Sequence, residues 1–176
     1  MTLDVTRSEL LVIDVQPRLL KAIDGAEALT LNLRRLVEAA RRLGVPVDFT
    51  EQNSRALGPT LPELGAAPEE VTEKMSFDAL RTPGFVDALN PEAAKVVAGA
   101  EAHICVTQTV LGLLGQGMKV YVVADAVGSR TPANRAAGLA RMERHGAEIV
   151  TTEMVLFEWL GTAEHPDFRA ISALIK

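Results

Sequence analysis

The feature of the sequence that most restricts its fold is a regular alternation of short apolar runs with helical stretches. LLVIDV (10–15) is an apolar run that ends in an acid, which is typical of a strand buried on both faces of a parallel sheet. Strands that alternate with helices predict a three-layer α/β/α fold, in which right-handed crossovers place helices on both faces of the sheet. The expected strands are 10–15, 45–50, 70–74, 95–100, 119–126 and 147–151.

The helices are predicted from apolar spacing and from their end signals. Leucine, valine and alanine recur at helical spacing between Leu29 and Leu43, and Gly44 ends that helix. Residues 51–70 are rich in glycine and proline and too long for a plain connection, which is typical of a functional loop. The other expected helices are 82–89, 105 to 115 or 117, 131–146, 152–160 and 166–175.

Composition narrows the class of protein. With 176 residues, 48% of them hydrophobic, and no linker or repeat, we expect one domain over residues 1–176. A net charge of −5 without a basic block argues against nucleic-acid binding. No apolar run reaches the roughly 18 residues that span a membrane, and the first residues lack signal-peptide features. We therefore expect a cytoplasmic protein.

Three polar residues fall at the carboxyl ends of expected strands, where sites lie in open α/β sheets. Asp14 ends the first strand, Lys74 ends the third, and Cys105, the single cysteine, follows the fourth at the start of a helix. Each has a structural alternative: a turn-capping acid, a solvated edge lysine and a packed thiol. An acid, an ammonium group and a thiol at one edge together indicate a catalytic site.

The expected chemistry of this edge is nucleophilic. A helix N-terminus and a neighbouring ammonium group both favour the thiolate of Cys105, and a carboxylate can accept the thiol proton and return it to a leaving group. We therefore expect the pKa of the thiol to lie below its usual value of about 8.5, with rapid alkylation by iodoacetamide.

Several segments resemble the isochorismatase-like cysteine hydrolases, a family that includes nicotinamidases. LLVIDVQ resembles the first strand of that family with its catalytic Asp, here Asp14, and EKMSFDAL resembles the segment with its catalytic Lys, here Lys74. GAEAHICVTQTVLGLLGQGMKVYVVADAVGSR resembles the nucleophile segment, which places the nucleophile at Cys105. EQNSRALGPTLPEL resembles a loop of a subgroup of isochorismatase-domain proteins. The resemblance covers nearly the whole chain.

The resemblance implies a six-stranded parallel, Rossmann-like sheet between helices. It also implies a cis peptide bond between Ala100 and Glu101, which directs the backbone N–H groups of Glu101 and Cys105 at one oxyanion position. We further expect the substrate pocket to be lined by residues near these motifs. The candidates are Gln16, Leu19, Phe77 and His103, the last with the alternative of a packed or exposed histidine.

This sequence differs from the metal-binding members of the family, and the differences narrow the expected function. The region VDFTEQNSRALG contains no histidine, so no metal site and no cofactor are predicted. An aromatic content of 4%, with Leu19 where nicotinamidases place a phenylalanine, weighs against a nicotinamide pocket. Since vinyl-ether hydrolysis of isochorismate uses no cysteine nucleophile, we expect a metal-independent hydrolase that cleaves a small amide-type C–N bond through a Cys105 thioester.

Other functions remain open at this stage. A thiol redox protein or sensor shares an activated Cys105 but needs a resolving thiol from a partner. A non-catalytic interaction module would keep only the fold. A dinucleotide-binding domain is disfavoured because no G-x-G-x-x-G follows the first strand.

The segment TEMVLFEWL (152–160) is apolar on more than one face, which predicts a homo-oligomer or, alternatively, a fully buried helix.

Overall fold

A parallel six-stranded sheet forms the centre of the protein, whose computed structural model describes residues 2–176. The strands lie in the order β3-β2-β1-β4-β5-β6, and every neighbouring pair is parallel. This confirms the predicted α/β fold with its six-stranded sheet. The strands are β1 (Ser8–Ile13), β2 (Val47–Gln52), β3 (Val71–Lys74), β4 (Ala94–Ala100), β5 (Val120–Gly128) and β6 (Glu148–Val150).

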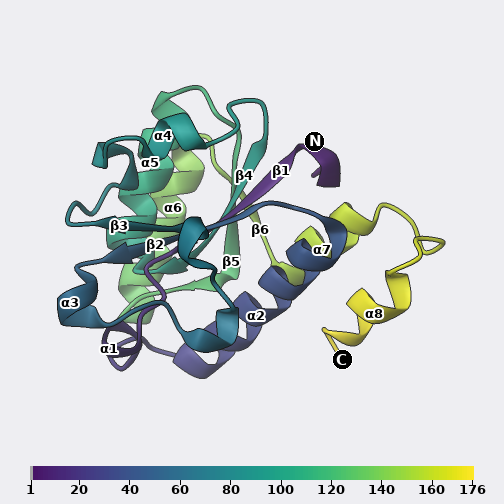
Figure 1. Ribbon diagram of the computed structural model, residues 1–176, viewed down its shortest axis with the longest axis horizontal. Helices are drawn as coiled ribbons and strands as arrows, with labels where there is room; N and C mark the ends of the chain where they lie inside the picture. The colour runs from purple at the N-terminus through teal and green to yellow at the C-terminus, as the bar shows by residue number, and fades with distance from the viewer. Residues whose placement is uncertain (1) are drawn as a thin grey trace.

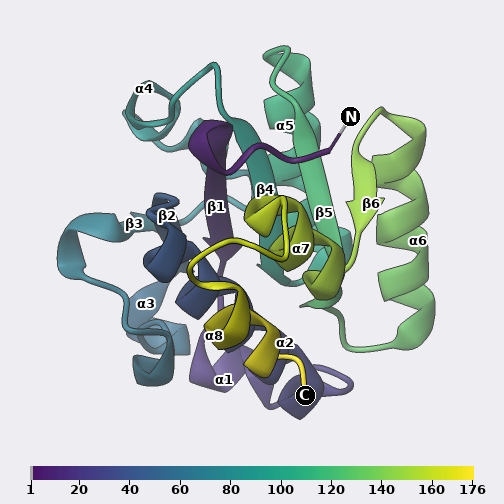
Figure 2. The same cartoon turned by 90° about the vertical axis from the view of Figure 1, so that its right-hand side faces the viewer.

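Helices cover both faces of the sheet, as Figures 1 and 2 show. One face carries α2 (Ala26–Leu43) and α7 (Thr152–Leu160), whose apolar side chains pack with Leu10 and Val12 of β1. The other face carries α5 (Thr107–Gly115) and α6 (Pro132–Arg144), which pack with the alternate residues of β1. Because successive strand residues point to opposite faces, a strand buried on both must be apolar throughout.

Element ends differ from the sequence-based expectation by a few residues. The first strand ends at Ile13 because Asp14 has a positive φ of 50°, a left-handed conformation outside the strand region. Residues 51–70 are a loop that also holds α3 (Ser54–Leu57) and two 3-10 turns, Pro62–Leu64 and Pro68–Glu70. The remaining elements are α1 (Pro17–Leu20), α4 (Phe85–Ala88), α8 (Phe168–Ala173), the 3-10 turns Val5–Arg7 and Ala79–Arg81, and a π-helical turn at Ala102–Val106.

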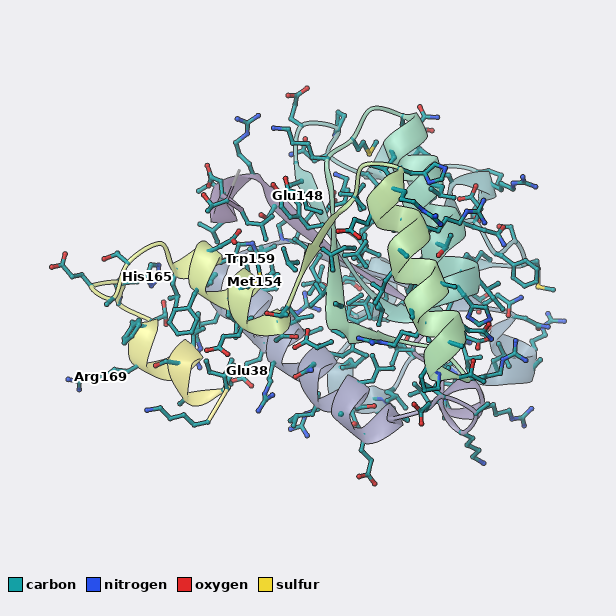
Figure 3. All side chains as sticks on the ribbon, turned by 180° about the vertical axis from the view of Figure 1, so that it is seen from behind. Glu38, Glu148, Met154, Trp159, His165 and Arg169 are labelled. Atoms are coloured by element: carbon teal, nitrogen blue, oxygen red, sulfur yellow. The ribbon has the colours of Figure 1, made fainter. Side chains whose placement is uncertain are left out.

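The packing of helix α7 explains why its sequence is apolar on nearly all sides. Four of its apolar residues are buried, and Trp159 also donates from Nε1 to Ser8 Oγ over 3.0 Å. Met154 and Phe157 keep exposures of 45% and 39%, and the Phe157 ring meets the edge of Phe168 at the start of α8. Figure 3 shows Met154 and Trp159 on this helix. Burial within one chain thus explains most of the pattern, and the homo-oligomer stays a prediction.

None of the helices within residues 2–176 combines the length and the apolar character that crossing a membrane requires.

A cluster of two buried and one partly buried charged residue lies at the amino ends of the strands, opposite the carboxyl edge. Glu9, Asp48 and Lys95 are each the second residue of their strands. The buried Lys95 Nζ donates to Glu9 Oε2 over 2.5 Å and to the carbonyl of Asn90. Burial of Asp48, together with the neighbouring charge of Glu9, raises the pKa of the Asp48 carboxyl to about 6.

We expect Asp48→Asn to stabilise the protein at pH 8 by about 1–2 kcal/mol, which is less than the roughly 3 kcal/mol that the full pKa shift corresponds to, because Asp48 is partly exposed and solvent screens its charge. The folded carboxyl binds its proton more tightly than the unfolded one, so stability is lost as pH rises from about 4, where the unfolded carboxyl ionises, to about 6, where the folded one does, and it is regained as pH falls. The difference from the wild type should therefore shrink at pH 5. Urea unfolding at both pH values measures it, with the exposed Asp87→Asn as control. A variant less stable than the wild type at pH 8 would contradict this account.

Candidate active site

Asp14, Lys74 and Cys105 come together at the carboxyl edge of the sheet. Asp14 directly follows β1, Lys74 is the last residue of β3, and Cys105 lies in the π-helical turn after β4. Lys74 Nζ lies 2.6 Å from Asp14 Oδ2, and both side chains are fully buried, at 0% exposure. The buried thiol of Cys105 lies close enough to this ion pair that the charges of Asp14 and Lys74 both shift its pKa. The three residues singled out in the sequence therefore form one contiguous cluster.

A fourth residue, Thr50, completes the surroundings of Asp14. It pairs with Ile13 in the register of β1 and β2, and its carbonyl accepts the backbone N–H of Asp14 over 3.0 Å. Its hydroxyl donates to Asp14 Oδ1 over 2.6 Å. Each carboxylate oxygen thus has a strong donor, which fixes the orientation of the group. The sequence signal for Thr50 is a hydroxyl residue on the second strand, close to the same edge as Asp14.

All three N–H donors of the Lys74 ammonium group have acceptors within the protein. Besides Asp14, its Nζ donates to the carbonyls of Ser76 over 3.2 Å and Phe77 over 3.4 Å. An ammonium group has three N–H donors, so none remains for a substrate. Phe77 contacts the site through its carbonyl, whereas its ring is half-exposed at the surface.

The expected low pKa of the Cys105 thiol is wrong. Burial and the negative charge of Asp14 raise this pKa to about 12, and the opposing effects of Lys74 and the Glu101 backbone N–H are smaller. The physical reason is that the ammonium group of Lys74 is already paired with Asp14, so its charge is largely cancelled at the sulfur. Desolvation then favours the neutral thiol. At rest the site holds a thiol beside a carboxylate.

The turn that carries Cys105 has an unusual backbone. The peptide bond between Ala100 and Glu101 is cis. The Glu101 carbonyl accepts the N–H groups of Ile104 and Val106, on either side of Cys105. Helix α6 supports this turn closely, since a Cβ on Gly138 would lie 2.8 Å from the Ala102 carbonyl oxygen. The approach of α6 therefore requires glycine at residue 138.

The other expected pocket residues make contacts of their own. Gln16 is buried, and its amide donates to the carbonyls of Gln52 and Gly58 and accepts the Gln52 N–H, so it holds the loop after β2. Leu19 is partly buried against the core on the α2 face. His103 is half-buried, with Nδ1 3.0 Å from Ser129 Oγ. None of these side chains has a hydrogen bond to Asp14, Lys74 or Cys105 among residues 2–176.

Two further features of the site region concern charge. Arg130, two residues after β5, pairs with the buried Glu101 through Nε at 2.9 Å. The sequence analysis does not single out Arg130, although an arginine a few residues after an expected strand at this edge is a usable signal. Within residues 2–176, no three side chains of His, Cys, Asp or Glu are grouped so that they could hold a metal ion.

Several known proteins resemble this chain in sequence and in fold. The isochorismatase domain matches residues 8–154. Isochorismatase domain-containing protein 2 of Xenopus laevis is 39% identical over 171 residues, which are 96% of this chain and 83% of that protein.

Two solved structures are also similar. The MAR1 ribonuclease structure from Caenorhabditis elegans superposes with a TM-score of 0.93 at 35% identity, over 99% of this chain and 92% of that one. YcaC from Pseudomonas aeruginosa, solved with hexane-2,5-diol and covalent acrylamide, gives 0.91 at 27% identity, over 99% and 90%. The fold, the sequence match and the clustered residues lead to one conclusion: the chain belongs to the isochorismatase domain family.

Proposed function

We propose that this protein is a cysteine hydrolase that cleaves the C–N bond of a small amide through a thioester on Cys105, without a metal ion. The observation that carries the proposal is the buried carboxylate of Asp14, which lies beside the thiol of Cys105 while Lys74 donates to its Oδ2. A nucleophile, a proton acceptor and an orienting group gathered at one place are the parts that covalent acyl transfer requires.

The first step forms the thioester. As the sulfur of Cys105 attacks the amide carbonyl, its proton moves to the Asp14 carboxylate, so that a free thiolate need not accumulate. The backbone N–H groups of Glu101 and Cys105 stabilise the oxyanion that develops. When the C–N bond breaks, the protonated Asp14 delivers the proton to the departing nitrogen, which leaves as ammonia or an amine.

The second step releases the acid. Water attacks the thioester carbon and gives a proton to Asp14, and the C–S bond then breaks as this proton returns to the sulfur. One water is consumed, one carboxylic acid leaves, and the thiol and carboxylate are restored. Lys74 and Thr50 keep the carboxylate oriented through both steps, because each donates to one of its oxygens.

The rival functions have less support. A redox sensor needs an exposed thiolate, whereas Cys105 is buried and its pKa is raised to about 12. The C. elegans relative is named a ribonuclease, but this chain has a net charge of −5, which does not favour a polyanionic substrate. The P. aeruginosa relative was solved with covalent acrylamide, a small amide, which is consistent with a reactive nucleophile in this family.

A parallel screen of small amides with the wild type and Cys105→Ala tests the proposal. We expect ammonia release by the wild type that survives exhaustive chelation with EDTA, and none by the variant. Denaturation in acid during turnover should trap an acyl adduct on Cys105, visible by mass spectrometry. Turnover that EDTA abolishes, or a Cys105→Ala enzyme with a near wild-type rate, would overturn the mechanism.

A further inference from the structure

Arg130 is a half-exposed arginine that the mechanism above does not use. Its Nε donates to Glu101 Oε2 over 2.9 Å, and its backbone N–H donates to the same oxygen over 3.4 Å. The Glu101 side chain is 8% exposed, whereas that of Arg130 is 53% exposed. The ion pair therefore has a buried end beside the nucleophile turn and an open end toward solvent.

The contact with Glu101 occupies only one edge of the guanidinium group. Within residues 2–176, neither Nη1 nor Nη2 of Arg130 makes a hydrogen bond. The guanidinium plane presents its N–H donors as a rigid fork that matches the two oxygens of a carboxylate. Because the Nε end is anchored, this fork loses less conformational freedom on binding an anion than a free arginine would.

Glu101 connects the fork to the nucleophile. Its carbonyl accepts the backbone N–H groups of Ile104 and Val106, on either side of Cys105, while its carboxylate holds Arg130. The guanidinium is therefore separated by one glutamate side chain from the backbone of the nucleophile turn, whose N–H groups are the expected oxyanion donors. Lys74 offers no competing site for an anion, since Asp14 and two carbonyls use its three donors.

From this geometry we propose that Arg130 binds a carboxylate of the substrate, so that the preferred substrates are small amides whose acyl chain ends in a carboxylate. The choice of an amide rests on the proposed function, whereas the binding of the carboxylate does not. In this scheme Arg130 is the specificity-determining residue, and Glu101 is a positioning residue for the guanidinium.

Binding without turnover tests the inference separately from the reaction. Calorimetry with Cys105→Ala compares malonamate, succinamate and glutaramate with the neutral amides in which a methyl group replaces the carboxylate. We expect at least one anionic amide to bind about 10- to 100-fold more tightly than its neutral partner, as a charge-assisted pair would give. Adding Arg130→Gln should remove this preference, and adding Arg130→Lys should retain part of it.

The controls separate binding from folding. Arg144→Gln, an exposed arginine at the end of α6, removes the same charge and should leave the preference intact. Thermal unfolding shows whether each Arg130 variant is folded at the assay temperature. Equal affinities for anionic and neutral amides across all three chain lengths, or a preference that survives Arg130→Gln, would overturn the inference.

Hydrolysis gives an independent outcome. If anionic amides bind through Arg130 but the wild type never cleaves them, the proposed reaction fails and the carboxylate site stands. If cleavage occurs, Arg130→Gln should raise KM for anionic amides about 10- to 100-fold and leave kcat/KM for neutral amides within about twofold. An equal loss for both kinds of amide would instead assign Arg130 a structural role and overturn the inference.

Discussion

Asp14→Asn should make Cys105 more reactive toward iodoacetamide while it reduces amide hydrolysis by about 10²–10⁴-fold. The negative charge of Asp14 raises the pKa of the thiol, and the positive charge of Lys74 lowers it. The asparagine removes the first effect and leaves the ammonium group without its partner. The thiolate then becomes the anion that Lys74 stabilises, so alkylation accelerates although the proton acceptor for catalysis is lost.

The measurement is the rate of Cys105 alkylation between pH 6 and 10, followed by intact mass. The midpoint for the wild type should lie above this range, since burial and Asp14 raise its pKa to about 12, and that of Asp14→Asn should be lower. Cys105→Ala controls for other sites of modification. Slower alkylation of Asp14→Asn would contradict the inference that the charge of Asp14 suppresses the thiolate, and hydrolysis at the wild-type rate would show that Asp14 is not the proton acceptor.

The meeting of Asp14, Lys74 and Cys105 could be predicted from the sequence because parallel strands end at one shared edge. Each residue lies at or just after an expected strand, so strand order was not needed to bring them to that edge. The expected layers follow from the same argument, because a strand that is apolar throughout must be covered on both faces.

The electrostatic state of the site could not be predicted in the same way. A sequence places Lys74 near both Asp14 and Cys105, but which of the two uses its charge depends on distances. The 2.6 Å contact between Lys74 and Asp14 decides it in favour of the carboxylate, and the thiol stays neutral. The roles of Thr50 and Arg130 depend likewise on single hydrogen bonds to residues that lie 36 and 29 positions away.

The charged cluster at the opposite edge of the sheet could not be predicted from the sequence either. Glu9, Asp48 and Lys95 each follow the start of a strand, where a charged residue is usually solvated. Only the register of the strands brings Glu9 beside Lys95 and Asp48 beside Leu11. Burial of charge is a property of the assembled layers, so residue spacing carries no signal for it.

Lys74→Met should destabilise the protein by about 3–5 kcal/mol and abolish hydrolysis, because it leaves the Asp14 carboxylate buried without its cation. Burial disfavours the charged form of a carboxyl group, so the variant's Asp14 is expected to take up a proton. A protonated Asp14 cannot accept the thiol proton of Cys105, and the first step of hydrolysis stops even where the variant is folded.

Lys95→Met provides the matched control, because Lys95 is also fully buried and paired with a carboxylate, Glu9, at the other end of the strands. Urea unfolding should show a large loss of stability in both variants. Below the urea concentration at which unfolding begins, Lys95→Met should keep a kcat within about twofold of the wild type, whereas Lys74→Met should have no measurable turnover. If folded Lys74→Met hydrolyses the substrate at the rate of Lys95→Met, then Lys74 only supports the fold, and the carboxylate of Asp14 does not depend on it for catalysis.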